Sequence, residues 1–263
     1  MAIALQPYTI RHEVFNREQA ESACKRISEM GFDGLEYGLG YGKGFTAEEE
    51  RLMYERYGLR ICDVYADLEK PESAMALADM YGTKYISAPG MTEQMMMSPE
   101  GFEAFAGLLN ETAKPYAAAG YKLMYHNHNQ EFRNFASLGG KPGLDILIEN
   151  TDPNGIYFLF DVFWASAAGA DPAFWLRRLH GRVRIVHFKD FAIDDQISGS
   201  IGSAIPFRFA EIGRGNINWP EVTAACRESG VEWYSVEQDH TRGGAFESAR
   251  ISLEYMRSKL NIK

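Results

Sequence analysis

Short apolar runs alternate along this chain with longer stretches in which apolar residues recur at helical spacing. We predict strands at the apolar runs 2–6, 33–37, 58–64, 83–88, 121–126, 156–161, 183–188 and 232–237. We predict amphipathic helices between them at 17–30, 46–57, 70–81, 99–119, 172–180, 219–229 and 244–260. Alternation of this kind is typical of parallel βα units. Because the strand runs number about eight, as in a β/α barrel, the pattern predicts an α/β fold, a single (β/α)8 TIM barrel over residues 1–263.

Two segments interrupt this alternation. Residues 189–218 form a long stretch with several glycines and no convincing helix, and long βα loops in barrels usually carry function. Residues 89–98 (PGMTEQMMMS) form a second irregular stretch on the same side of the predicted barrel. Its methionines suit either a flexible apolar wall or a patch that covers a neighbouring helix or subunit.

Composition narrows the classes of partner. A length of 263 residues with 46% hydrophobic content suits one large domain, and a net charge of −9 disfavours nucleic acid as the ligand. Cys24, Cys62 and Cys226 are too scattered for a disulfide framework or a zinc knuckle. We find neither a secretion signal nor an apolar stretch long enough for a membrane span. These features predict a cytoplasmic protein that acts on a small polar molecule, with a homo-oligomer left open.

Four polar residues stand at the ends of four predicted strands, and they point to chemistry at one mouth of the barrel. They are His126, Asp161, His187 and Glu237. The carboxyl ends of barrel strands meet at one face, so these residues should converge there. Histidine and carboxylate side chains are typical ligands of a catalytic divalent metal. We therefore predict a shared metal site.

Further candidates lie close to these strand ends. His128 and Glu131 follow His126, and alternation along an extended chain places both histidines on the same side. The alternatives are a loop histidine bonded to its neighbours and a solvated acid. Glu36 ends the second predicted strand and would bind a substrate hydroxyl, act as a base, or form a salt bridge with a loop arginine.

Two cations and one aromatic residue complete the candidate substrate-binding set. Lys189 and Arg208 would hold an oxygen of a polar ligand, although Lys189 also has Asp190 beside it as a simple ion-pair partner. Trp164 offers a flat surface on which a sugar stacks, or it serves as a core residue at the rim. The glycines of 38–44 and 213–216 match no nucleotide-binding fingerprint, and turns explain them better.

The segments GYKLMYHNHNQEF, FDVFWASAAGADP, GRVRIVHFKDF, EIGRGNINWPEV and WYSVEQD together resemble a known family. They are similar to the xylose isomerase-like TIM barrels of the sugar phosphate isomerase/epimerase group, which is related to inosose dehydratase, the ketose 3-epimerases and endonuclease IV. The resemblance covers most of the chain. It implies one divalent metal ion, Mn, Mg, Co or Zn, bound at His126, Asp161, His187 and Glu237.

The chain departs from the pattern of this family at two positions. The epimerases and endonuclease IV have a glutamate where this chain has His126, and related enzymes often have a histidine where Trp164 stands. The first departure leaves His128 or Glu131 as alternative metal ligands, and argues against a simple epimerisation by two glutamates. The second argues against a nuclease with several metals.

The resemblance implies an isomerase or epimerase that removes a proton next to the carbonyl of a sugar or polyol. The catalytic acid and base would come from Glu237, His126, His128 and Glu131. One alternative is a dehydratase or lyase acting on a keto-inositol or a 3-keto-glycoside through the same first step. A second alternative is a sugar-binding barrel without catalysis.

Overall fold

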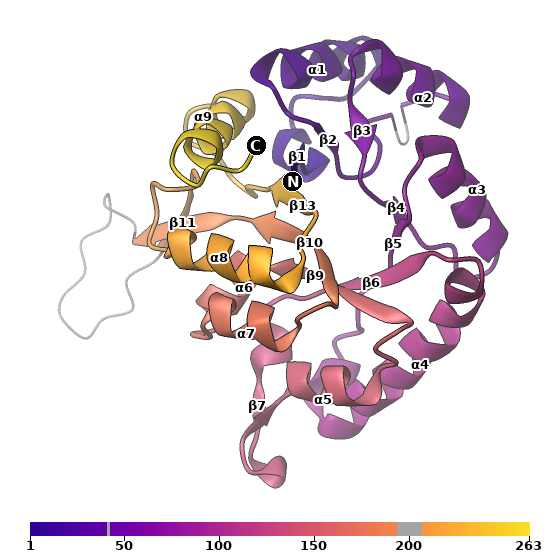
Figure 1. Cartoon of the computed structure of the whole chain (residues 1–263), viewed down its shortest axis with the longest axis vertical. Helices are drawn as coiled ribbons and strands as arrows, with labels where there is room; N and C mark the ends of the chain where they lie inside the picture. The colour runs from indigo at the N-terminus through magenta and orange to yellow at the C-terminus, as the bar shows by residue number, and fades with distance from the viewer. Residues whose placement is uncertain (41–42, 194–206) are drawn as a thin grey trace.

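The computed structural model describes residues 1–40, 43–193 and 207–263, and it shows strands that surround a common centre with helices outside them (Figure 1). The strands of the main sheet are β1 (Ala2–Leu5), β2 (Gly34–Leu35), β3 (Arg60–Ile61), β4 (Val64–Tyr65), β5 (Tyr85–Ser87), β6 (Lys122–His126), β9 (Ile156–Asp161), β10 (Val183–Phe188) and β13 (Trp233–Val236). They run in the order β3-β2-β1-β13-β10-β9-β6-β5-β4, and every neighbouring pair is parallel.

The two edge strands of this order, β3 and β4, come from one predicted run and are separated only by Cys62 and Asp63. The covalent chain therefore joins the two ends of the sheet. The buried Asp63 carboxylate accepts hydrogen bonds from the backbone N–H of Tyr37, which follows β2, and from the Ser87 hydroxyl on β5. Side-chain bonds thus replace part of the strand ladder where the third run is broken. The predicted (β/α)8 barrel is confirmed.

The helices are α1 (Arg17–Met30), α2 (Ala47–Arg56), α3 (Pro71–Tyr81), α4 (Pro99–Ala118), α5 (Gly143–Asn150), α6 (Val162–Ala167), α7 (Pro172–Arg178), α8 (Trp219–Ser229) and α9 (Ala245–Ser258). All the predicted helices are present within a few residues of their expected bounds. Helices α5 and α6 were not predicted. Helix α5 begins after Pro142 without a side-chain cap. Helix α6 is capped by Asp161 but has only six residues, too few for a clear helical pattern in the sequence.

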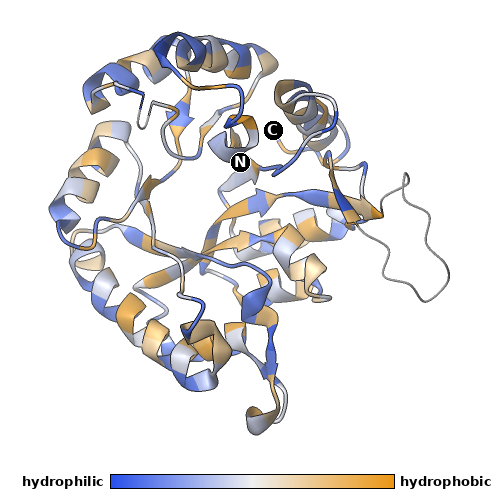
Figure 2. Ribbon diagram, turned by 180° about the vertical axis from the view of Figure 1, so that it is seen from behind, coloured by the Kyte–Doolittle hydropathy of each residue, from blue (hydrophilic) through white to orange (hydrophobic). Residues whose placement is uncertain are grey.

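The core follows the alternation of side chains along each strand. In β1, Ile3 and Leu5 belong to the large cluster that the strands share with the helices, whereas Ala2 and Ala4 belong to a smaller cluster with side chains from the other strands. That smaller cluster consists of Ala2, Ala4, Cys62, Tyr85, Met124, Leu159, Ile185 and Trp233. The helices carry both polar and apolar residues, as Figure 2 shows, which fits one face against the barrel and one toward solvent.

The segment 189–218 contains regular structure that the sequence pattern did not indicate. β11 (Asp190–Ile193) and β12 (Phe207–Ala210) pair in an antiparallel hairpin, and residues 194–206 between them lie outside the described part of the chain. A second small hairpin pairs β7 (Asn134–Phe135) with β8 (Lys141–Pro142). Of the methionines in 89–98, Met95 and Met96 pack against the large core cluster.

Among the residues that the structure describes, no helix combines the length and the apolar character needed to cross a bilayer.

Candidate metal-binding active site

Four neighbouring strands bring the four predicted metal ligands together. His126 ends β6, Asp161 ends β9, His187 lies in β10, and Glu237 follows β13. These strands are consecutive in the barrel, and His187 pairs directly with Asp161 across the β9–β10 ladder. Glu237 continues the next ladder, because its backbone N–H donates to Phe188 O at 3.1 Å. The four side chains therefore stand side by side at the carboxyl ends of the strands.

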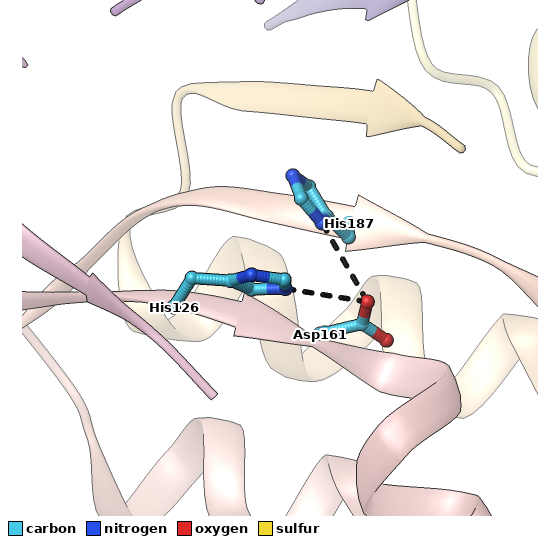
Figure 3. A group of neighbouring side chains, drawn as sticks. All are labelled: His126, Asp161 and His187. Atoms are coloured by element: carbon cyan, nitrogen blue, oxygen red, sulfur yellow. Dashed lines mark hydrogen bonds and ion pairs between the residues drawn. The ribbon is translucent and has the colours of Figure 1, made fainter. Parts of the chain in front are cut away.

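His126, Asp161 and His187 form a compact group whose potential ligand atoms all lie within 4.8 Å of one another (Figure 3). Asp161 Oδ2 lies 3.4 Å from His126 Nε2 and 3.5 Å from His187 Nδ1. The other oxygen of Asp161 caps α6, since Oδ1 accepts a hydrogen bond of 3.0 Å from Trp164 N. The start of α6 thus fixes the carboxylate and leaves Oδ2 directed at the two histidines.

Glu237 lies against this group. Its Oε2 is 3.0 Å from His187 Nδ1. Burial by itself raises the pKa of Glu237, but His187 and Lys189 outweigh burial and lower it to about 2. The carboxylate is therefore charged at neutral pH, which suits a metal ligand or a general base.

The second ring nitrogen of His187 is bonded to Glu36. His187 Nε2 lies 2.7 Å from Glu36 Oε2 and 3.0 Å from Oε1, and the Gln6 amide donates to Glu36 Oε1 at 3.1 Å. A carboxylate behind a histidine is the usual partner that orients a metal-binding imidazole. Glu36 thus directs Nδ1 of His187 toward Asp161 and Glu237. It forms no ion pair with an arginine in the described part of the chain.

The donor set fits a divalent cation. His187 Nδ1 is buried and has no hydrogen-bond partner, although an unpaired buried nitrogen is costly. Glu237 Oε2 is also buried and makes no hydrogen bond of good geometry. Burial lowers the pKa of His187, but the charges of Glu36 and Glu237 outweigh it and raise the pKa well above the ordinary value. This excess of negative charge around His187 favours a cation.

Lys189 supplies one positive charge to this group of carboxylates. Its Nζ lies 2.7 Å from Glu237 Oε2, 3.0 Å from Asp239 Oδ1 and 3.3 Å from Asp161 Oδ2. Burial lowers the pKa of Lys189, yet these carboxylates raise it above its usual value. The simple pairing of Lys189 with Asp190, considered from the sequence, is not what the structure shows.

Asp190 has a structural role instead. Its carboxylate accepts hydrogen bonds from the backbone N–H groups of Gly213, Gly215 and Ile217 and from the indole N–H of Trp219. A Cβ at position 215 would lie 2.2 Å from Asp190 Oδ1. The glycines of 213–216 therefore form a turn around a buried carboxylate, as the turn interpretation predicted.

His128 and Trp164 form part of the wall next to the metal-ligand group. The His128 ring lies 4.7 Å from the His126 ring and 5.5 Å from the Trp164 ring, measured between centroids. Burial, and then the charge of His126, lower the pKa of His128 to about 4, so this ring is neutral at physiological pH.

Glu131 lies behind His128. The carboxyl group is fully buried and accepts hydrogen bonds from the Tyr125 hydroxyl and, at 2.9 Å, from His128 N. Burial raises the pKa of Glu131. The alternative of a solvated acid is therefore wrong, and the contacts of Glu131 fix the backbone that carries His128.

A cavity of about 420 Å³ opens at this end of the barrel. Seven of the predicted site residues line it: Glu36, His126, His128, Trp164, His187, Lys189 and Glu237. Asp161, Glu131 and Arg208 are not among the lining residues. Arg208 lies on β12 and borders a different hollow with Arg214 and Gln238. The structure thus gathers most of the candidates at one mouth and places Arg208 elsewhere.

Several polar residues of this cavity were missed in the sequence. They are Gln6, Tyr37, Tyr65, Ser87 and Asp239, with Asp63 buried beside them. Each follows or ends a strand of the barrel, so the strand-end argument applied to every strand would have found them. Burial and the charge of Glu36 raise the pKa of Asp63 to about 7.

Comparison with known proteins agrees with this geometry. Residues 24–259 match the family described as xylose isomerase-like TIM barrel. The chain belongs to this family. Solved structures superpose on nearly the whole chain. One is a sugar phosphate isomerase/epimerase from Parabacteroides distasonis, with a TM-score of 0.79, 21% identity and coverage of 100% of this chain and 96% of the other.

The chain is also similar to two further proteins. The inosose dehydratase of Mesomycoplasma hyopneumoniae (strain J) is 24% identical, in an alignment that covers 92% of this chain and 89% of the relative. The structure of the IOLI protein, described with a bound zinc atom, aligns with a TM-score of 0.67 and 18% identity, covering 98% of this chain and 97% of the other.

Proposed function

We propose that this barrel is a metal-dependent dehydratase of a neutral keto-polyol, which removes a proton next to a carbonyl and then expels a hydroxyl group as water. The observation that carries the proposal is the position of Glu237. Its carboxylate lines the open cavity and lies against the group of His126, Asp161 and His187. A base beside a metal-binding group is the arrangement that proton abstraction next to a carbonyl requires.

In this proposal His126, Asp161 and His187 hold the metal, and Glu36 orients His187. A divalent ion bound there would polarise the carbonyl oxygen of the substrate and make the neighbouring carbon more acidic. The Glu237 carboxylate accepts the proton from that carbon. Lys189 holds Glu237 in place through the 2.7 Å contact with Oε2.

Elimination needs a proton carrier on only one face of the substrate. When the C–H bond breaks, its electron pair forms a carbon–carbon double bond, and the C–O bond of the next carbon breaks. The hydroxyl leaves as water with the proton that Glu237 has taken, so the carboxylate is restored. Epimerisation requires a second proton carrier on the opposite face. The position of the second glutamate of the epimerases holds His126 here, and this proposal uses His126 as a metal ligand, which favours elimination.

The charges of the cavity favour a substrate without phosphate. Lys189 is the only lysine or arginine among the described residues that line it, and its ammonium group already contacts Asp161, Glu237 and Asp239. Apart from the proposed metal ion, which would bind the carbonyl oxygen, a phosphate would meet several carboxylates and no unpaired lysine or arginine among these residues. The cavity therefore suits hydroxyl and carbonyl groups, with Trp164 and His128 as the flat wall.

The second candidate is the isomerase or epimerase that the sequence predicts. The likeness in fold to a sugar phosphate isomerase/epimerase supports it, and it shares the first proton abstraction. His126 or His128 would then return the proton from the other face. This candidate differs from the dehydratase only in the second step, in which a proton returns to the substrate and no water is lost.

The test uses the purified protein loaded in turn with Mn²⁺, Mg²⁺, Co²⁺ and Zn²⁺, and incubated in deuterated water with 2-keto-myo-inositol. The proposal expects deuterium at the carbon next to the carbonyl and a product that has lost one water. Exchange or isomerisation without water loss would support the second candidate. Glu237→Gln should abolish exchange, whereas Glu254→Gln, an exposed carboxylate on α9, should not. Sugar binding that persists in EDTA, without any exchange, would favour the non-catalytic barrel.

A further inference from the structure

A second hollow of about 690 Å³ adjoins the cavity that contains the metal-ligand group. Tyr37 and Tyr65 line both spaces, so the two tyrosines form a common wall. The hollow extends from this wall toward α2 and α3, where Glu50, Leu77 and Tyr81 line it. Its volume lies within the range of roughly 300–1,000 Å³ that is typical of small-molecule pockets.

The shared wall is held in an unusual conformation. Tyr37 has a positive φ of 36°, which a side chain with a Cβ rarely adopts. Its backbone N–H donates to Asp63 Oδ1 at 3.2 Å, and its ring lies 4.8 Å from the Tyr65 ring. Strained backbone of this kind persists only where surrounding contacts hold it in place, and it is common at ligand-binding sites.

The lining is apolar and carries no cation. Apolar side chains from β4 to α3 form much of it, namely Val64, Ala66, Leu68, Ala74 and Leu77. The charged lining residues are Glu50 and Asp67, and no lysine, arginine or histidine borders the hollow in the described part of the chain. An anionic group would be repelled, whereas a neutral aromatic or aliphatic group would bury apolar area.

Glu50 places a buried, hydrogen-bonded carboxylate in the wall of this pocket. Its side chain is 7% exposed, and its carboxylate accepts hydrogen bonds from the hydroxyls of Tyr54 and Tyr81 and from Gly40 N. A Cβ at Gly38 would lie 2.2 Å from Glu50 Oε1, so the glycine is needed for the approach of the carboxylate. Gly38 and Gly40 therefore lie against a buried carboxylate rather than a phosphate. Among the described residues Tyr81 is the one donor to Glu50 Oε2, and a carboxylate oxygen accepts two hydrogen bonds.

From these observations we infer that the hollow binds a neutral, apolar or aromatic substituent of the polyol. The carbonyl end of the same polyol would occupy the cavity beside His126 and His187. This inference rests on the proposed function for the identity of the polyol. It extends the substrate class from free keto-polyols to glycoside-like molecules with an uncharged aglycone. The Tyr37–Tyr65 wall would lie beside the bond that joins the two parts.

The test measures binding without turnover, by isothermal titration of the metal-loaded protein with three probes. The probes are methyl β-D-glucopyranoside, phenyl β-D-glucopyranoside and glucose 1-phosphate. We expect the phenyl glycoside to bind about tenfold more tightly than the methyl glycoside, because the ring buries apolar area. We expect no saturable binding of the phosphate.

Three variants locate the effect. Leu77→Trp should fill the hollow and abolish the advantage of the phenyl glycoside. Leu68→Ser, at a lining position that is already 52% exposed, should reduce this advantage without a risk to folding. Leu108→Ser is the matched control, because Leu108 is 45% exposed on α4 and does not line the hollow.

Equal affinity for the methyl and phenyl glycosides, a phenyl advantage that survives both lining variants, or absence of binding by all three probes would overturn the inference. Failure of the proposed function is read separately, from deuterium exchange of unsubstituted 2-keto-myo-inositol by the wild-type protein. Deuterium exchange without tighter binding of the phenyl glycoside would leave the dehydratase proposal intact and refute the binding role inferred for the hollow. Tighter binding of the phenyl glycoside without deuterium exchange would support the hollow as a binding site and refute the dehydratase proposal.

Discussion

Glu36 and His187, which are 151 positions apart in the sequence, form a buried pair in which Glu36 Oε2 lies 2.7 Å from His187 Nε2. The pair joins β2 and β10, from different sides of the barrel. Because His187 Nε2 is bonded to Glu36, Nδ1 is the ring nitrogen that faces Asp161 and Glu237 and would bind a metal. A residue outside the group of His126, Asp161 and His187 thus orients one of its members.

Glu36→Gln should therefore weaken metal binding. An amide keeps the size of the side chain but loses the charge that holds the imidazole, and loss of such a partner typically costs about 10- to 100-fold in metal affinity. The measurement is a competition titration of Zn²⁺ against a fluorescent chelator. Glu13→Gln, on the surface near α9, serves as the control. Unchanged zinc affinity in Glu36→Gln would contradict the role assigned to this pair.

Lys189→Met should destabilise the metal-free protein and increase the stabilisation that a metal provides. Removal of the ammonium leaves Asp161, Glu237 and Asp239 without their cation, and breaking a buried ion pair from one side costs about 3–5 kcal/mol. A divalent cation would compensate these charges more strongly in the variant than in the wild type. Thermal unfolding with and without Mn²⁺ measures the difference. An equal rise in Tm for both proteins would argue that Lys189 and the metal do not share these carboxylates.

Asp190→Asn should destabilise the fold without altering the metal site directly. The carboxylate accepts hydrogen bonds from several backbone N–H groups and from Trp219 Nε1 at 2.6 Å, and an amide nitrogen in its place would face donors. Loss of a buried acceptor costs about 1–3 kcal/mol for each group left unpaired. Urea unfolding should show a lower midpoint, whereas exposed Glu93→Gln should leave it unchanged. A midpoint equal to that of the wild type would refute the anchoring role.

The three cysteines should react slowly with a thiol reagent in the native protein. Cys24, Cys62 and Cys226 are free and buried, and burial raises the pKa of each thiol, that of Cys24 to about 12. The reactive thiolate is therefore scarce at pH 8. Labelling with a colorimetric disulfide should be slow until denaturant is added and should then reach three thiols per chain. Fast native labelling would contradict the burial.

The sequence by itself determined the barrel and the end at which its candidate metal ligands meet. Apolar runs with turn glycines and amphipathic stretches between them predict parallel βα units, and this alternation is local, so it can be read without a structure. The polar residues at the ends of these runs, His126, Asp161, His187 and Glu237, then converge because all parallel strands of a barrel end at one face. The match to the xylose isomerase-like family agrees with both conclusions.

Only the tertiary structure decided which side chains meet. It placed Glu36 behind His187, directed Lys189 to Asp161 and Glu237 rather than to Asp190, and buried Glu131 under His128. It also joined Asp63 to the strands on either side of the broken third run. These contacts cross the barrel or depend on side-chain rotation, so their geometry follows from the packing of the whole fold and has no local signal in the sequence.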